Sequence, residues 1–173
     1  LTKGPNVMLG YWQEARSIAD AEGWLNTGDQ ARIDDDGRIF ITGRIKDIIV
    51  LSSGEKVPPD DLQMAIAVDP LFEQVVVIGE GRPFLTAIVV LNPSQWQALA
   101  QKQGIDPAQN ELLNSPQVHA LILEKIAYRL KTFPGYARVH RVHVQIEPWS
   151  IDSGLITAAL KVRRKQHCPV KKL

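Results

Sequence analysis

Two short apolar runs, separated by a glycine-containing turn, constrain the fold of this chain most strongly. They cover residues 74–79 and 85–91, and residues 79–83 (Gly-Glu-Gly-Arg-Pro) join them. Apolar runs of this length between turn residues are typical of strands, whereas a membrane-spanning helix needs about 20 apolar residues. The pattern therefore predicts a β-hairpin with at least one buried face.

Three helices are expected around this hairpin, because each predicted start carries a proline, which a first helical turn tolerates. The starts are at residues 58–59, 92–93 and 115–116, and the ends are near Ala67, Gly104 and Pro134. Residues 139–146 alternate basic and apolar side chains and predict a half-exposed strand. This mixture of elements makes residues 48–173 an α+β domain.

The first 43 residues are rich in Gly and Asp and predict β-structure. Residues 32–33 and 38–41 form an expected hairpin around residues 34–37 (Asp-Asp-Asp-Gly), with a positive φ at Gly37. The acidic triplet lacks the spacing of a calcium-binding loop. His140 and His143 lie three residues apart, but no further ligand completes a metal site. No metal centre is predicted.

The charge of the chain is uneven, although the net charge is only +1. Residues 125–173 contain eleven Lys or Arg and two acidic residues. A basic half favours a polyanionic partner, such as nucleic acid, anionic lipid or a nucleotide like CoA; a merely solvated basic face is the alternative. Nucleic acid is disfavoured, because no aromatic residues interleave with the charges. The single cysteine, Cys168, fits a reducing compartment.

Four motifs follow one another in a characteristic order. Residues 23–29 read Gly-Trp-Leu-Asn-Thr-Gly-Asp, and residues 44–47 (Arg-Ile-Lys-Asp) begin fifteen residues after Asp29. Residues 53–59 (Ser-Gly-Glu-Lys-Val-Pro-Pro) come next, and residues 151–164 end in Leu-Lys and a basic stretch. The set resembles the carboxyl-terminal motifs of the adenylate-forming superfamily, which includes acyl-CoA synthetases, peptide-synthetase adenylation domains and luciferases.

The resemblance implies a domain organisation. Residues 1–43 would be the β-rich end of a large amino-terminal domain, residues 44–47 a hinge, and residues 48–173 a small, mobile, mixed α/β carboxyl-terminal domain. The Gly/Ser/Thr-rich phosphate loop of the family lies far upstream and has no counterpart in this sequence. We therefore expect the rear portion of an enzyme, which is inactive as an isolated fragment.

The resemblance also assigns nucleotide-binding residues. Enzymes of this family join a carboxylate to ATP to give acyl-AMP and pyrophosphate, and a thiol then displaces AMP. Asp29 matches the aspartate that binds both ribose hydroxyls of ATP or AMP. Arg44 matches the arginine on the ribose and phosphate side, with a surface ion pair to Asp47 or a neighbour as the alternative. Lys46 matches the hinge position.

The remaining assignments concern the two half-reactions. Gly54, with Glu55 and Lys56, matches the loop that borders the pantetheine tunnel during thioester formation. Lys161 matches the lysine that stabilises the adenylation transition state. Arg163 and Arg164 follow it and are expected to contact CoA phosphates or anionic lipid.

Details of the last motif favour the long-chain fatty acyl-CoA synthetases. Leu160 precedes the lysine, as in that branch, whereas Ala158–Ala159 replaces the usual Pro-Thr pair. The implied substrates are fatty acid, ATP and CoA, with Mg²⁺ held by the amino-terminal domain of the same protein. A cytoplasmic enzyme is expected, with a peripheral position on the inner face of the membrane as a further option. Two alternatives remain: a ligase that loads an acyl carrier protein, and a non-enzymatic basic binding module.

Overall fold

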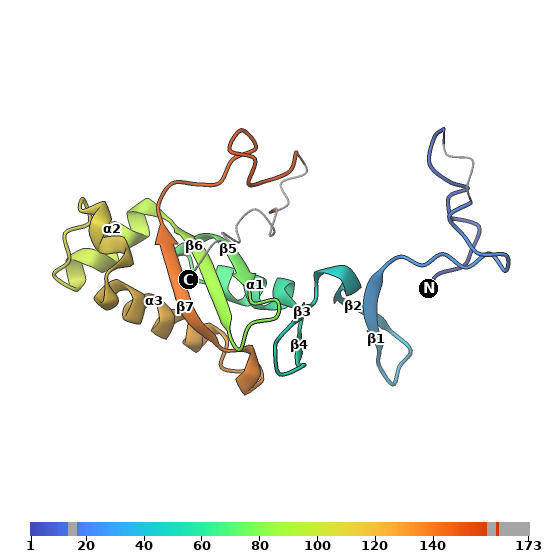
Figure 1. Cartoon of the computed structure of the whole chain (residues 1–173), viewed down its shortest axis with the longest axis horizontal. Helices are drawn as coiled ribbons and strands as arrows, with labels where there is room; N and C mark the ends of the chain where they lie inside the picture. Colours follow the sequence, from blue (N-terminus) through green and yellow to red (C-terminus); the bar gives the residue numbers. More distant parts are fainter. Residues whose placement is uncertain (14–16, 159–161, 163–173) are drawn as a thin grey trace. The chain divides into compact units, whose positions relative to one another are not determined.

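The computed structural model describes residues 1–13, 17–158 and 162 of the chain. It divides into two compact units, Leu1–Ile48 and Ile49–Leu173 (Figure 1). Each unit is described by itself below.

The first unit is built around a β-hairpin. Strands β1 (Asp29–Ile33) and β2 (Ile39–Arg44) pair antiparallel, and a single 3₁₀ turn, η1 (Ile45–Asp47), follows them. The Asp34 carboxylate accepts hydrogen bonds from the backbone N–H groups of Asp36 and Arg38, at 3.1 and 2.8 Å. Gly37 has φ +78°. The predicted hairpin and its glycine are therefore confirmed, with strands that extend further toward Asp29 and Arg44 than expected.

The second unit combines a three-stranded sheet with helices. Two short strands, β3 (Ile49–Val50) and β4 (Lys56–Val57), come first and pair antiparallel. The remaining elements are, in chain order, α1 (Pro59–Ala67), β5 (Phe72–Ile78), β6 (Leu85–Leu91), α2 (Pro93–Lys102), η2 (Asn110–Asn114), α3 (Pro116–Arg129), η3 (Gly135–Ala137) and β7 (Val139–Gln145). These elements confirm the predicted α+β class.

Helices α2 and α3 each begin at a side-chain cap. The Asn92 side chain accepts the backbone N–H of Gln95 at 3.2 Å, and the Ser115 hydroxyl accepts that of Val118 at 3.4 Å. In each case the proline comes directly after the cap, where its missing N–H has no helical partner to lose.

The sheet has the strand order β5-β6-β7, with β6 in the middle (Figure 1). Strand β5 pairs antiparallel to β6, whereas β7 pairs parallel to it. A parallel neighbour requires a long connection, which α2 and α3 provide. The sequence predicts each strand but not this pairing.

Each face of the sheet supports a separate apolar cluster. Helix α1 packs against β5, and α3 packs against β7. The main core includes Val77 and Val89 of the sheet together with Ile122 of α3, and all three are fully buried. On the opposite face, a smaller cluster is formed by Val76, Ile88, Val90, Trp149 and Ile156. The residues after β7 therefore cover the face of the sheet that lies opposite to the main core.

A side chain from η2 pairs with the outer edge of β7. The Asn114 amide donates to the Val144 carbonyl at 2.9 Å and accepts the Val144 N–H at 3.0 Å. This pattern imitates the exchange of hydrogen bonds with a neighbouring strand. The unpaired N–H and carbonyl groups of an exposed edge strand are a template for pairing with another chain. At Val144, the Asn114 side chain forms hydrogen bonds with both of these groups.

In the described parts of the chain, no helix combines the length and the apolar character needed to cross a membrane.

Candidate nucleotide-binding site

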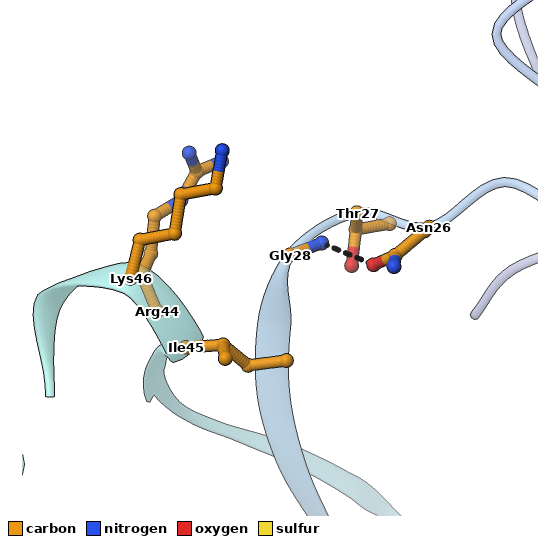
Figure 2. A pocket seen from close by; sticks show the side chains of 6 residues that line it. All are labelled: Asn26, Thr27, Gly28, Arg44, Ile45 and Lys46. Atoms are coloured by element: carbon orange, nitrogen blue, oxygen red, sulfur yellow. Dashed lines mark hydrogen bonds between the residues drawn. The ribbon is translucent and has the colours of Figure 1, made fainter.

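A tight turn in the first unit positions Asp29 at the start of β1. The Asn26 side-chain oxygen accepts the backbone N–H of Gly28 at 2.9 Å (Figure 2), and the Thr27 hydroxyl accepts that of Asp29 at 3.3 Å. Gly28 adopts φ +73°, a conformation that favours glycine. Its carbonyl accepts the N–H of Ile45 at 2.8 Å. The turn is therefore fastened to the residue that follows β2.

Asp29 and Arg44 face each other across the hairpin. They are register partners in the ladder between β1 and β2, and Nε of Arg44 lies 3.0 Å from Oδ1 of Asp29. The Asp29 side chain is 26% exposed and that of Arg44 is 61% exposed. The structure therefore brings the two predicted nucleotide residues together as an ion pair. Asp29 is therefore an ion-pair partner of Arg44.

The ion pair leaves further binding capacity on both groups. It uses one carboxylate oxygen of Asp29, and the second oxygen can accept hydrogen bonds from a ligand. Arg44 is bound through Nε, so its two terminal nitrogens can donate to an anion. An exposed pair of this kind contributes little to stability, which is compatible with a role in binding.

A pocket of about 360 Å³ lies beside this pair. The turn at residues 26–28 and the segment at residues 44–46 line it. In Figure 2, the Arg44 and Lys46 side chains project in the same direction, whereas the Ile45 side chain points toward β1. The volume is at the lower end of the range for small-molecule sites. Asn26 and Thr27 belong to the motif at residues 23–29, but the sequence alone did not mark them as pocket residues.

The predicted hinge residue, Lys46, lies in the single turn η1. The flanking residues are extended, with φ −102° and ψ 134° at Arg44 and φ −62° and ψ 127° at Ile48. Any residue adopts these angles without strain, and the side chain of Lys46 is exposed. The boundary between the two compact units falls two residues further on, after Ile48.

In the second unit, Gly54 lies in the turn between β3 and β4. Its N–H donates to the Leu51 carbonyl at 2.9 Å, and the N–H of Leu51 donates to the Glu55 carbonyl at 2.9 Å. Gly54 has φ +93°, and an added Cβ would meet no described atom within 4 Å. The turn itself therefore favours glycine, and the space beside it is open.

Glu55 and Lys56 complete this loop. The Ser53 hydroxyl donates to Oε2 of Glu55. This hydrogen bond, with a smaller contribution from the backbone, lowers the pKa of the Glu55 carboxyl below its ordinary value. Lys56 is exposed at the start of β4.

The turn between β5 and β6 holds the β3–β4 hairpin in place. The Glu80 carboxylate accepts the Val50 N–H at 2.9 Å, and the Val50 carbonyl accepts the Gly81 N–H at 2.8 Å. The N–H of Ser52 donates to the Arg82 carbonyl at 2.9 Å. The sequence indicates only a turn at residues 79–83, because nothing local to them points to a partner 30 residues earlier.

Lys161, Arg163 and Arg164 lie outside the described residues. The chain is described up to residue 158, and Trp149 and Ile156 are buried against the sheet. Ile156 also forms an isolated antiparallel bridge with Val162. Within the described ranges, no three His, Cys, Asp or Glu side chains gather in a way that could hold a metal ion.

A family model described as the AMP-binding enzyme C-terminal domain matches residues 46–166. The chain is 29% identical over 169 residues to the long-chain-fatty-acid–CoA ligase FadD15 of Mycobacterium tuberculosis, which covers 95% of this chain and 28% of that protein. It is 33% identical over 168 residues to long-chain-fatty-acid–CoA ligase 5 of Rattus norvegicus, covering 94% of this chain and 25% of the relative. The chain thus spans about a quarter of the length of these relatives.

A solved structure agrees with these sequence relationships. The adenylation domain of a carboxylate reductase from Mycobacterium chelonae superposes with a TM-score of 0.71 at 25% identity. The superposition covers 87% of this chain and 22% of that domain chain.

Proposed function

Because the chain belongs to the family of AMP-binding enzyme C-terminal domains, we propose that it is the mobile carboxyl-terminal part of an AMP-forming fatty acyl-CoA synthetase. Such an enzyme converts fatty acid, ATP and CoA to acyl-CoA, AMP and pyrophosphate. Two relatives that match nearly the whole chain carry the name long-chain-fatty-acid–CoA ligase, which supports this substrate class.

The observation that carries the proposal is the pocket between residues 26–28 and 44–46, with the Asp29–Arg44 ion pair beside it. A carboxylate accepts hydrogen bonds from two adjacent hydroxyls, so Asp29 would hold the ribose of ATP or AMP. Arg44 would present its terminal nitrogens to the ribose and phosphate side of the nucleotide. Lys46 adds a second positive charge along the same edge of the pocket.

In the first half-reaction, a carboxylate oxygen of the fatty acid attacks the α-phosphorus of ATP, and pyrophosphate leaves. Negative charge grows on the phosphate oxygens in the transition state. Lys161 would stabilise that charge from a fixed position, which is a large contribution in a site that excludes water. A nucleotide held by Asp29 and Arg44 would already be oriented for the attack.

In the second half-reaction, the thiol of CoA attacks the acyl carbonyl, and AMP leaves. We propose that the second unit rotates about Lys46 between the two steps, because a hinge needs backbone angles that can change without strain. The rotation would move Lys161 away from the reacting groups and bring the loop of Gly54, Glu55 and Lys56 to them. The open space beside Gly54 would then admit the pantetheine arm.

The proposal also includes several partners. Arg163 and Arg164 would contact the phosphates of CoA or an anionic membrane surface. Mg²⁺ would be held by the amino-terminal domain of the full-length protein, which we place in the cytoplasm. A carrier-protein thiol in place of CoA is the competing acceptor, and a thiol-acceptor assay with both substrates separates the two.

The nucleotide assignment is tested by Asp29→Asn in the full-length protein. The substitution keeps the shape of the side chain but replaces the charged carboxylate with a neutral amide. The carboxylate is the group that would accept hydrogen bonds from the ribose hydroxyls. We expect the Kd for AMP, measured by titration calorimetry, to rise roughly 10- to 100-fold, as when a hydrogen bond to a charged group is lost.

Asp36→Asn is the matched control, because Asp36 is an exposed aspartate of the same hairpin, outside the pocket. Its AMP affinity should equal that of the unmodified protein. Equal AMP affinity in the Asp29 and Asp36 variants would exclude Asp29 from the nucleotide site.

A further inference from the structure

The edge of β3 that faces away from β4 is hydrogen-bonded to the turn between β5 and β6. The Val50 N–H donates to Oε2 of Glu80 at 2.9 Å, and the Val50 carbonyl accepts the Gly81 N–H at 2.8 Å. Two residues later, the Ser52 N–H donates to the Arg82 carbonyl at 2.9 Å. Alternate residues of a strand direct their backbone groups to the same side. The turn therefore takes the place of a neighbouring strand along this edge.

The turn that provides these contacts is itself fixed. The Arg82 N–H donates to the Gly79 carbonyl at 2.9 Å, and Gly81 has φ +65°, a conformation that favours glycine. At Gly79, an added Cβ would lie 2.7 Å from Cδ2 of Leu85 and 3.2 Å from the Phe84 carbonyl oxygen. Leu85 is fully buried in the main core. The position of Glu80 is therefore determined by the start of β6.

The β3–β4 hairpin, which carries Gly54, is held on two sides. Ile49, Leu51 and Val57 are buried in the main core, and the turn binds the outer edge. Leu51 lies between the two residues that the turn binds, and its carbonyl accepts the Gly54 N–H at 2.9 Å. A shift of Val50 would therefore be passed to Gly54 through Leu51. Because the apolar contacts remain, loss of the outer contact should shift the hairpin and not unfold it.

We propose that Glu80 is a positioning residue for the Gly54 loop during thioester formation, an inference that rests on the proposed function. It acts through the backbone of Val50 and not on a substrate. Of the three hydrogen bonds between the turn and β3, this is the one that a side chain makes. The first half-reaction is assigned to Lys161, so Glu80 should influence the second half-reaction alone.

The chemistry of the contact predicts which substitutions matter. A backbone N–H needs an acceptor but no negative charge, and the side-chain oxygen of glutamine is an acceptor in the same position. Methionine is unbranched and of similar length, but its sulfur is only a weak acceptor. Glu80→Gln should therefore preserve the position of Val50, whereas Glu80→Met should release it.

The test measures both half-reactions of Glu80→Met and Glu80→Gln in the full-length protein. In the methionine variant, we expect kcat for thioester formation from supplied acyl-adenylate to fall roughly 10-fold, as misplacement of a substrate-positioning loop predicts. The glutamine variant should stay within about twofold of the unmodified protein, and so should acyl-adenylate formation in both variants. Hydrogen–deuterium exchange of peptides covering residues 49–57 should be faster in the methionine variant only.

Glu73→Met is the matched control, because Glu73 is an exposed glutamate of β5 with no recorded hydrogen bond within the described residues. Both of its half-reactions should be normal. A merely structural role of Glu80 would slow both half-reactions together, in proportion to the folded protein lost, which thermal unfolding measures. Equal slowing of both steps would therefore overturn the proposal. Equal effects of Glu80→Gln and Glu80→Met would also overturn it, because the charge and not the acceptor would then be responsible.

Gly54→Leu separates this inference from the proposed function. If Gly54→Leu slows thioester formation but Glu80→Met does not, the positioning role is overturned while the function stands. If Gly54→Leu leaves thioester formation unchanged, the proposed role of the loop is overturned, and this inference with it.

Discussion

At the scale of single residues, the structure ties the ionisation of Glu55 to one neighbour. The Ser53 hydroxyl is the largest cause that lowers the pKa of Glu55 from its ordinary value of 4.5, and a backbone hydrogen bond adds to it. A carboxyl whose pKa is lowered by folding stabilises the folded state above its unfolded pKa. That contribution is lost as the pH falls through the lowered value, and therefore below 4.5.

Ser53→Ala should raise the pKa of Glu55 toward 4.5, because the main hydrogen bond to the carboxylate is removed. Side-chain carboxyl titration by NMR measures this directly. Asp106 is an internal control, since its pKa is lowered by hydrogen bonds from Ala108 and Gln109 and should not respond. An unchanged pKa of Glu55 in the variant would show that Ser53 does not set its ionisation.

At the scale of secondary-structure elements, the outer edge of β7 depends on Asn114. We expect Asn114→Ala to lower the free energy of unfolding by about 1–3 kcal/mol, because it leaves the N–H and carbonyl of Val144 without this partner. Chemical denaturation of the variant measures the loss. Gln117→Ala is the control, since Gln117 is exposed near the start of α3. Equal stability of the two variants would contradict a structural role for the Asn114 amide.

Elements with local signals were predictable from the sequence. The helix starts at residues 92–93 and 115–116, the turn at Gly37 and the two apolar runs each depend on neighbouring residues, and all of them are confirmed. Local patterns carry no information about which distant segments meet. The parallel pairing of β7 with β6 is one such contact, and so it was not predicted.

In the candidate site, too, the residues were predictable from the sequence but their contacts were not. Motif spacing singled out Asp29 and Arg44, but their ion pair depends on the register of the hairpin, including its irregularity between Gln30 and Ala31. Two hydrogen-bonded contacts between distant residues were not predicted. Glu80 binds Val50 and Gln74 binds Trp149 across 30 and 75 residues, and isolated Glu or Gln residues in a sequence give no sign of such partners.

At the scale of the whole molecule, the proposed chemistry is divided between two compact units. The first unit contains the Asp29–Arg44 pair and the pocket, and the second contains the Gly54 loop and the segment that leads to Lys161. The boundary between the units follows Ile48, close to the proposed hinge at Lys46. The central claim is that the second unit serves both half-reactions through different residues.

The most direct measurement compares the two half-reactions in the full-length protein carrying Lys161→Ala or Gly54→Leu. Lys161→Ala should slow acyl-adenylate formation by about 100-fold or more, as when one preorganised charge is lost, and nearly spare thioester formation from supplied acyl-adenylate. Gly54→Leu should do the reverse by blocking the thiol. Gly37→Leu is the control for backbone strain, because Gly37 also has a positive φ and open space around it. If both substitutions slow the same half-reaction while Gly37→Leu slows neither, the claim is contradicted.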